Sequence, residues 1–203
     1  VYKRQVHYND ITLMQSASDS ASPLAFNKSN IAQVSLQLDA GNANLGTIVS
    51  NANALASLGV NQIMGASGSL TLSFAQALSN VATTVLASAS PLLSFAASDN
   101  VTVNLAQSDI PSGGGADTGV VNFEHELAVL QKAHVDSIHA VSGSLTFNVS
   151  EIQAIHSIGL NFAAGDQIVL SDTRAHLSAV IDSPASYATW GATTIAASDG
   201  LSL

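Results

Sequence analysis

The 203-residue sequence contains no cysteine. This absence excludes a disulfide scaffold, a thiolate zinc site and a cysteine nucleophile together. No apolar run approaches the roughly 20 residues that a membrane-spanning helix requires, so we expect no membrane span. Aromatic residues make up only 5% of the chain, which leaves few large side chains to anchor a core.

Basic residues are also scarce. Five Lys and Arg stand against fourteen Asp and Glu, which gives a formal net charge of −9. Binding to a phosphate backbone needs clustered Lys and Arg, so we expect no nucleic acid partner. Only 9% of residues are charged while 47% are hydrophobic, a composition that favours a folded chain over an acidic disordered tail.

The first five residues read Val-Tyr-Lys-Arg-Gln. This string resembles the translation of an adapter used in preparing sequencing libraries. We therefore interpret residues 1–5 as a sequencing or cloning scar and exclude them from fold reasoning. A natural N-terminus with a basic pair is the alternative interpretation.

Two pairs of segments match within the chain, each at a constant offset. Positions 55–72 match positions 130–147 and share the string Ser-Gly-Ser-Leu-Thr, and positions 93–101 match positions 160–168. Such self-similarity is typical of a repeat protein. Units are predicted to begin near Leu24, Val60, Leu93, Val135 and Leu160, with a partial unit from Thr193 to Leu203.

Each unit is predicted to form a short strand, a tight turn, a second short strand and then a helix. Residues 136–139 lead into the turn at Ser142-Gly143, and residues 145–149 alternate apolar and polar side chains as a half-buried strand does. We expect Ser150 to cap the helix that follows and Gly159 to end it.

Two further helices are predicted by apolar spacing. One covers residues 44–58. The other has Asn122 as its cap, Glu124 and Glu126 in its first turn, and apolar residues at helical spacing from Phe123 to Leu130.

A single unit cannot stabilise itself. About 25 residues lose roughly 1–2 kcal/mol of backbone entropy each, while about six large apolar side chains contribute roughly 1.5–3 kcal/mol each on burial. Stacked units that share a continuous core avoid this deficit. The predicted fold class is therefore α/β, a solenoid-like repeat of short parallel strands with short helices. An ordinary α/β domain with one duplicated motif is the alternative.

The predicted organisation follows from the matches. Residues 6–110 form the repeat units of a first copy, and residues 120–203 form those of a second copy that is truncated at its C-terminus. A Gly-rich connector over residues 111–119 separates the two copies.

Histidines raise the question of a metal site, because five of the six lie in the second copy: His125, His134, His139, His156 and His176. No His-Glu-x-x-His pattern is present, and the matched positions of the first copy lack histidine. We therefore assign no metal ligands.

Calcium is a weaker candidate ligand. Residues 112–117 resemble the glycine-aspartate calcium nonapeptide of exported toxins, but the aspartate falls one place early and the motif occurs once. Calcium could reach four aspartates expected to be exposed in turns: Asp99, Asp166, Asp172 and Asp199. Because turn chemistry alone explains the equivalent positions of Asp99 and Asp166, no cofactor is predicted.

Enzyme motifs are absent. Ser69 and Ser144 lie in Gly-Ser-Leu-Thr and not in a Gly-x-Ser-x-Gly elbow, and no phosphate loop occurs. Asp136 and Glu151 could serve as a carboxylate pair for glycoside hydrolysis, but their spacing does not select them. We predict no catalytic or cofactor-binding residues. Trp190 is the one aromatic residue outside the recurring core pattern.

Residues 54–60, 67–73 and 159–173 resemble repeats in very large bacterial exoproteins of adhesin or haemolysin type. The resemblance implies an extracellular or cell-surface array that provides reach, display and adhesion. Its partners would be neighbouring repeats of the same chain and host or cell-surface glycans or proteins.

The predicted function is thus a structural or adhesive repeat segment of a long exported bacterial surface protein, without catalytic activity. A solenoid enzyme acting on polysaccharide and a calcium-responsive binding module are the alternatives.

Overall fold

The computed structural model describes residues 3–7, 33–38, 44–57, 60–80, 90–111, 118–180 and 184–200. The predicted unit near Leu24 and most of the predicted connector lie outside these residues. Within the described ranges, no helix is both long and apolar enough to cross a membrane.

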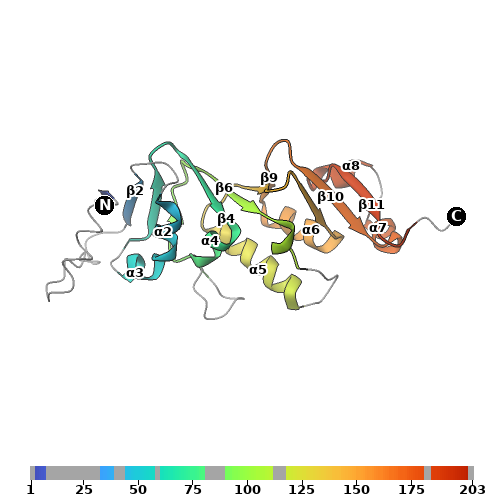
Figure 1. The fold of residues 1–203 in the computed structure, drawn as a ribbon, viewed down its shortest axis with the longest axis horizontal. Coiled ribbons are helices and arrows are strands. Elements are labelled where there is room, and N and C mark those ends of the chain that lie inside the picture. The colour runs from blue at the N-terminus through green and yellow to red at the C-terminus, as the bar shows by residue number, and fades with distance from the viewer. Residues whose placement is uncertain are drawn as a thin grey trace.

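Short strands and short helices alternate along the described chain. The strands are β1 (Lys3–His7), β2 (Gln33–Leu38), β3 (Gln62–Gly65), β4 (Ser69–Ser73), β5 (Ser94–Phe95), β6 (Asn100–Leu105), β7 (Ser137–Ala140), β8 (Ser144–Phe147), β9 (Asn161–Phe162), β10 (Gln167–Asp172) and β11 (Thr194–Ala197). The helices are α2 (Leu45–Ser50), α3 (Ala52–Ser57), α4 (Phe74–Ser79), α5 (Thr118–Lys132), α6 (Val149–Ile158), α7 (Arg174–Val180) and α8 (Pro184–Thr189), with a 3-10 turn η2 (Gln107–Asp109). These elements follow one another along the long axis of the molecule (Figure 1).

The strands form three parallel sheets with the orders β1-β2-β3-β5, β4-β6-β7-β9 and β8-β10-β11. The predicted class, α/β with parallel strands and short helices, is confirmed. Strands that are joined by a tight turn enter different sheets: β3 lies in the first sheet and β4 in the second, and β7 and β8 are divided in the same way. Each strand–turn–strand segment therefore ties two sheets together.

The segments that match in sequence have the same conformation. Gly68 and Gly143 occupy the turns between β3 and β4 and between β7 and β8, with φ of +67° and +74°. The hydroxyl of Ser67 donates to the carbonyl of Ser69 (3.3 Å), and that of Ser142 donates to the carbonyl of Ser144 (3.0 Å). A positive φ favours glycine at both turns, because glycine has no Cβ.

One hydrophobic core runs from Leu45 to Ala192. Alternate residues of β6 enter it, so that Val101, Val103 and Leu105 are buried while their neighbours are not. This is the period of two that parallel strands with one covered face require.

Helix starts differ from the sequence expectation. α6 is capped by Asn148 and not by Ser150, because the backbone of Asn148 is extended and its side chain accepts the N–H of Glu151 (2.9 Å). The Glu151 carboxylate accepts the N–H of Asn148 in return (2.8 Å), which completes a capping box. The expected end of this helix at Gly159 is correct, since Gly159 has a φ of +86°.

The other two predicted helices also have different limits. α5 begins at Thr118, so Asn122 is not its cap and Glu124 and Glu126 lie beyond its first turn. The single helix expected over residues 44–58 is two helices, α2 and α3, with Asn51 between them. The apolar positions were predicted correctly, because the core and not the cap sets the spacing.

The N-terminal residues take part in the first sheet. β1 includes Lys3, Arg4 and Gln5, three of the residues that the sequence analysis set aside. They pair in parallel with residues 33–35 of β2. Residues 3–5 are therefore part of the first sheet, and the interpretation of residues 1–5 as a scar stays a prediction.

Candidate functional site

Two segments link a helix to the next strand in the same way. Residues 130–136, the first junction, link α5 to β7, and residues 187–193, the second junction, link α8 to β11. In the first junction the Val135 N–H donates to the Leu130 carbonyl (3.0 Å), and in the second the Ala192 N–H donates to the Tyr187 carbonyl (3.1 Å).

The residues that precede these donors share an unusual backbone. His134 has a φ of +66° and Gly191 a φ of +82°. Trp190 therefore occupies the position in the second junction that Ala133 occupies in the first.

The first junction is closed. The Ala133 carbonyl accepts the N–H of Phe95 from β5 (2.8 Å). Both residues are only 1% exposed. The aromatic ring at this strand end thus belongs to the core.

The second junction is open. Phe162 of β9 corresponds to Phe95, but in the described part of the chain no backbone hydrogen bond joins it to Trp190. Both aromatic side chains are half-buried and pack on the edge of the core. A cavity of about 390 Å³ lies between β9 and the second junction.

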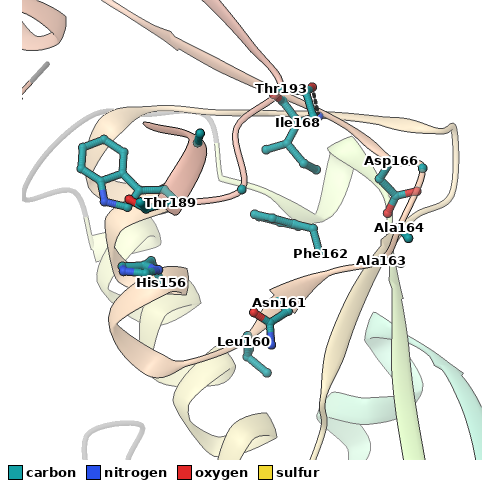
Figure 2. A pocket seen from close by; sticks show the side chains of 14 residues that line it. His156, Leu160, Asn161, Phe162, Ala163, Ala164, Asp166, Ile168, Thr189 and Thr193 are labelled. Atoms are coloured by element: carbon teal, nitrogen blue, oxygen red, sulfur yellow. Dashed lines mark hydrogen bonds between the residues drawn. The ribbon is translucent and has the colours of Figure 1, made fainter. Parts of the chain in front are cut away.

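The cavity wall combines aromatic and polar groups. Figure 2 shows Phe162 between His156 on one side and Asp166 on the other, with Asn161 beside it. The ring of Phe162 packs against the ring of Phe147, and the two ring centroids are 5.5 Å apart. The side chains of His156 and Asn161 are exposed, so their hydrogen-bonding groups face solvent at the rim.

Gly191 controls how closely the second junction approaches this wall. A Cβ atom at Gly191 would lie 2.8 Å from the Cδ2 atom of Phe162. Only glycine fits this approach, and the positive φ of Gly191 favours the same residue.

Asp99 and Asp166 were expected to be exposed, and this expectation was wrong. They are 7% and 8% exposed. The Asp99 carboxylate accepts the N–H of Gly65 (2.6 Å), and the Asp166 carboxylate accepts the N–H of Ala140 (2.8 Å). Each aspartate therefore ties the start of one strand to the end of another, and burial follows from that bond.

The second oxygen of Asp166 is also engaged, because it lies 3.0 Å from the Nδ1 atom of His139. The carboxylate thus forms part of the cavity wall without a free oxygen for a ligand.

Asp172 is partly buried and fully engaged. One of its oxygens accepts the N–H of Val149 (3.1 Å), and the other accepts the N–H of Thr173 (2.7 Å) and lies 2.8 Å from Nδ1 of His176. Burial acts to raise the pKa of this carboxyl, but these donors outweigh it and hold the pKa below its ordinary value. Of the four predicted aspartates, only Asp199 is exposed.

Among the described residues, Glu151 is the carboxylate with a buried oxygen that lacks a hydrogen-bond partner. It is 3% exposed, and its Oε1 atom has no hydrogen-bond partner. Burial raises the pKa of Glu151, the bond from the Asn148 N–H opposes this rise, and the charges of Asp172 and Glu124 add to it. Glu151 and Asp172 both line a shallow groove of about 300 Å³. The partnerless oxygen is itself covered and does not open onto that groove.

Asp136 and Glu151, the carboxylate pair considered and not selected from the sequence, serve two separate backbone groups. Asp136 accepts the N–H of Val101 (2.8 Å), whereas Glu151 belongs to the capping box of α6. The structure therefore gives this pair no shared chemistry.

The five histidines of the second copy do not converge. His139 and His176 each contact one aspartate, whereas His134 and His156 lie exposed at helix ends and His125 lies on α5. In the described ranges no three His, Asp or Glu side chains gather to hold a metal ion. Ser69 and Ser144 lie at the starts of β4 and β8, where they form part of the recurring turns.

In the sequence Trp190 stands apart from the recurring core pattern, but no local signal marks His156, Asn161 and Phe162 as its neighbours. The signal that joins them is the correspondence of residues 187–193 to residues 130–136, which share no identical residue. Comparison of the chain with protein-family models, with curated proteins and with solved structures finds no match.

Proposed function

We propose that this chain is a structural and adhesive repeat segment of a long exported bacterial surface protein, folded as a solenoid-like stack. One observation carries the proposal: the strand–turn–strand–helix pattern recurs, and each sheet takes its strands from several successive units. Within the part of the chain that the structure describes, no unit has a sheet of its own, so units stabilise one another as solenoid repeats do.

The carboxylates support a structural role. Asp99, Asp136 and Asp166 each accept a backbone N–H from a segment far away in the sequence. A polysaccharide-degrading enzyme would instead direct a pair of carboxyl groups at a bound sugar. In this chain the three aspartates instead hold neighbouring strands together.

Composition supports an extracellular setting. An acidic chain with few lysines and no cysteine remains soluble and escapes oxidative cross-linking outside the cell. In this proposal the partners are adjacent repeats of the same chain and glycans or proteins at a host or cell surface.

Bead attachment tests the adhesive half of the proposal. Beads coated with the full chain should attach to bacterial or epithelial cells more than beads coated with an unrelated protein of equal net charge. Attachment equal to the control would remove adhesion from the proposal. Release of reducing sugar from cell-surface polysaccharide would favour the enzyme alternative.

A further inference from the structure

We infer that the cavity between β9 and the second junction binds a neutral saccharide. Trp190 and Phe162 supply the apolar wall, and Asn161 and His156 supply hydrogen bonds at the rim. The inference rests on the adhesive half of the proposed function and gives it a specific site.

The two junctions show why this wall is suited to a ligand. In the first junction Phe95 is completely buried, and its backbone N–H donates to the Ala133 carbonyl. In the second, the larger Trp190 stands in place of Ala133, and Trp190 and Phe162 are both only partly buried and line the cavity. Burial of aromatic surface is favourable, so a ligand that covers the exposed part of these two rings is stabilised by that burial.

The chemistry of the wall selects a sugar ring. A pyranose has an apolar face of C–H groups and a polar edge of hydroxyls. The apolar face of the sugar can stack on an aromatic ring. The amide of Asn161 and the imidazole of His156 can donate hydrogen bonds to the sugar hydroxyls and accept hydrogen bonds from them. A purely apolar ligand would make no hydrogen bond to either of these rim groups.

Charge selects a neutral sugar. The Asp166 carboxylate lies in the cavity wall, and the chain carries a net charge of −9, so an acidic saccharide is repelled. A cation gains little in its place, because both Asp166 oxygens are already engaged by Ala140 and His139.

The volume fits a short saccharide. Small-molecule pockets span about 300–1,000 Å³, and this cavity of about 390 Å³ lies at the lower end. It therefore suits one or two sugar rings at the end or in the middle of a longer glycan.

Trp190 itself provides the assay, because it is the only tryptophan of the chain. The full chain is titrated with maltose, cellobiose, lactose and N,N′-diacetylchitobiose while the fluorescence of Trp190 is recorded. We expect a saturable change with at least one of these disaccharides. Calorimetry of the same pair should give the same dissociation constant.

Three variants separate this site from unspecific contact. Asn161→Ala and His156→Ala each remove one exposed hydrogen-bonding group and should weaken binding about three- to tenfold. Trp190→Ala copies the first junction and should abolish the calorimetric signal. Asn100→Ala is the matched control, because Asn100 is also exposed at a strand start but lies outside the cavity.

Three results would overturn the inference. The first is no saturable response to any of the four disaccharides by either method. The second is saturable binding of tetramethylammonium with none of any sugar. The third is binding that Asn161→Ala, His156→Ala and Trp190→Ala all leave intact. Bead attachment that persists without disaccharide binding would refute this site and leave the proposed function standing.

Discussion

The first and second junctions share a local turn but differ in their side chains and in one backbone bond, the bond from the Phe95 N–H to the Ala133 carbonyl. Each junction contains a residue with a positive φ. In each, the N–H of the next residue donates to the carbonyl of the residue five positions before that donor. Yet one buries Phe95 and the other leaves a cavity beside Phe162. The same local turn thus lies beside a closed core in one place and beside an open cavity in the other.

The largest expected effect comes from the two strand-end rings. Phe95→Ala should lower the free energy of unfolding by about 3–5 kcal/mol, because a fully buried ring leaves a cavity in the core. Phe162→Ala should cost only roughly 1–2 kcal/mol, because that side chain is only partly buried. Urea denaturation followed by circular dichroism measures both. Equal losses would show that the second junction is closed in solution.

Asp136 and Thr193 give the next comparison, because they occupy the same position in the two junctions. Asp136 accepts the N–H of Val101 (2.8 Å), and the Thr193 hydroxyl accepts the N–H of Ile168 (2.9 Å). Asp136→Ala should cost about 1–3 kcal/mol by leaving a buried N–H without an acceptor.

The swap Asp136→Thr is the control for that loss. It should restore most of the stability, because threonine performs this role in the second junction. A swap as damaging as the alanine variant would mean that the two positions are not equivalent.

A smaller effect is expected where the two turns differ in residue type. His134 holds a φ of +66° that glycine adopts without strain. His134→Gly should therefore stabilise the protein by about 0.5–1 kcal/mol, after the greater unfolded-state entropy of glycine is subtracted. Thermal unfolding would reveal the gain. Gly191→Ala is the opposing test and should destabilise, since its Cβ meets Phe162.

The smallest effect concerns pH and compares two capping boxes. Ser73 and Gln76 cap α4 in the same way as Asn148 and Glu151 cap α6. Because the folded pKa of Glu151 is raised, the folded state holds its proton when the unfolded state has lost it. Stability should fall as pH rises from the ordinary value of 4.5 through the raised one.

Glu151→Gln, which copies the first capping box, should make that fall smaller, and burial also raises the pKa of Glu126, which accounts for the remainder. Asp172 has the opposite sign, since its lowered pKa makes stability fall as pH drops below 3.8. Urea midpoints measured across the acidic range separate the two groups. A fall above pH 4.5 that Glu151→Gln leaves unchanged would assign it to another carboxyl.

The sequence predicted the local elements well and their long-range bonds poorly. Ser-Gly-Ser-Leu-Thr indicated the turn and strand at 67–73 and 142–147 because a glycine turn and an apolar alternation are local signals. The burial of Asp99 was not predictable, since its partner Gly65 lies 34 residues away. Its short polar side chain fits a solvated turn equally well.

The only indication of the cavity in the sequence is one aromatic residue that lies outside the recurring core pattern. Trp190 departed from the core pattern, but nothing local indicates that it replaces Ala133. Trp190 and Ala133 are equivalent because the residues that follow them, Gly191 and His134, both have a positive φ. A histidine in the sequence does not indicate a positive φ.

The shared core is tested most directly by unfolding a variant at one end and observing the other. Ile63→Ala removes a fully buried side chain from β3, and Trp190 fluorescence reports on the second junction. If successive units share one core, the fluorescence and circular dichroism transitions in urea coincide, and both shift to lower urea by the equivalent of about 2–5 kcal/mol. A Trp190 transition that stays in place while the circular dichroism transition shifts would contradict the stacked array.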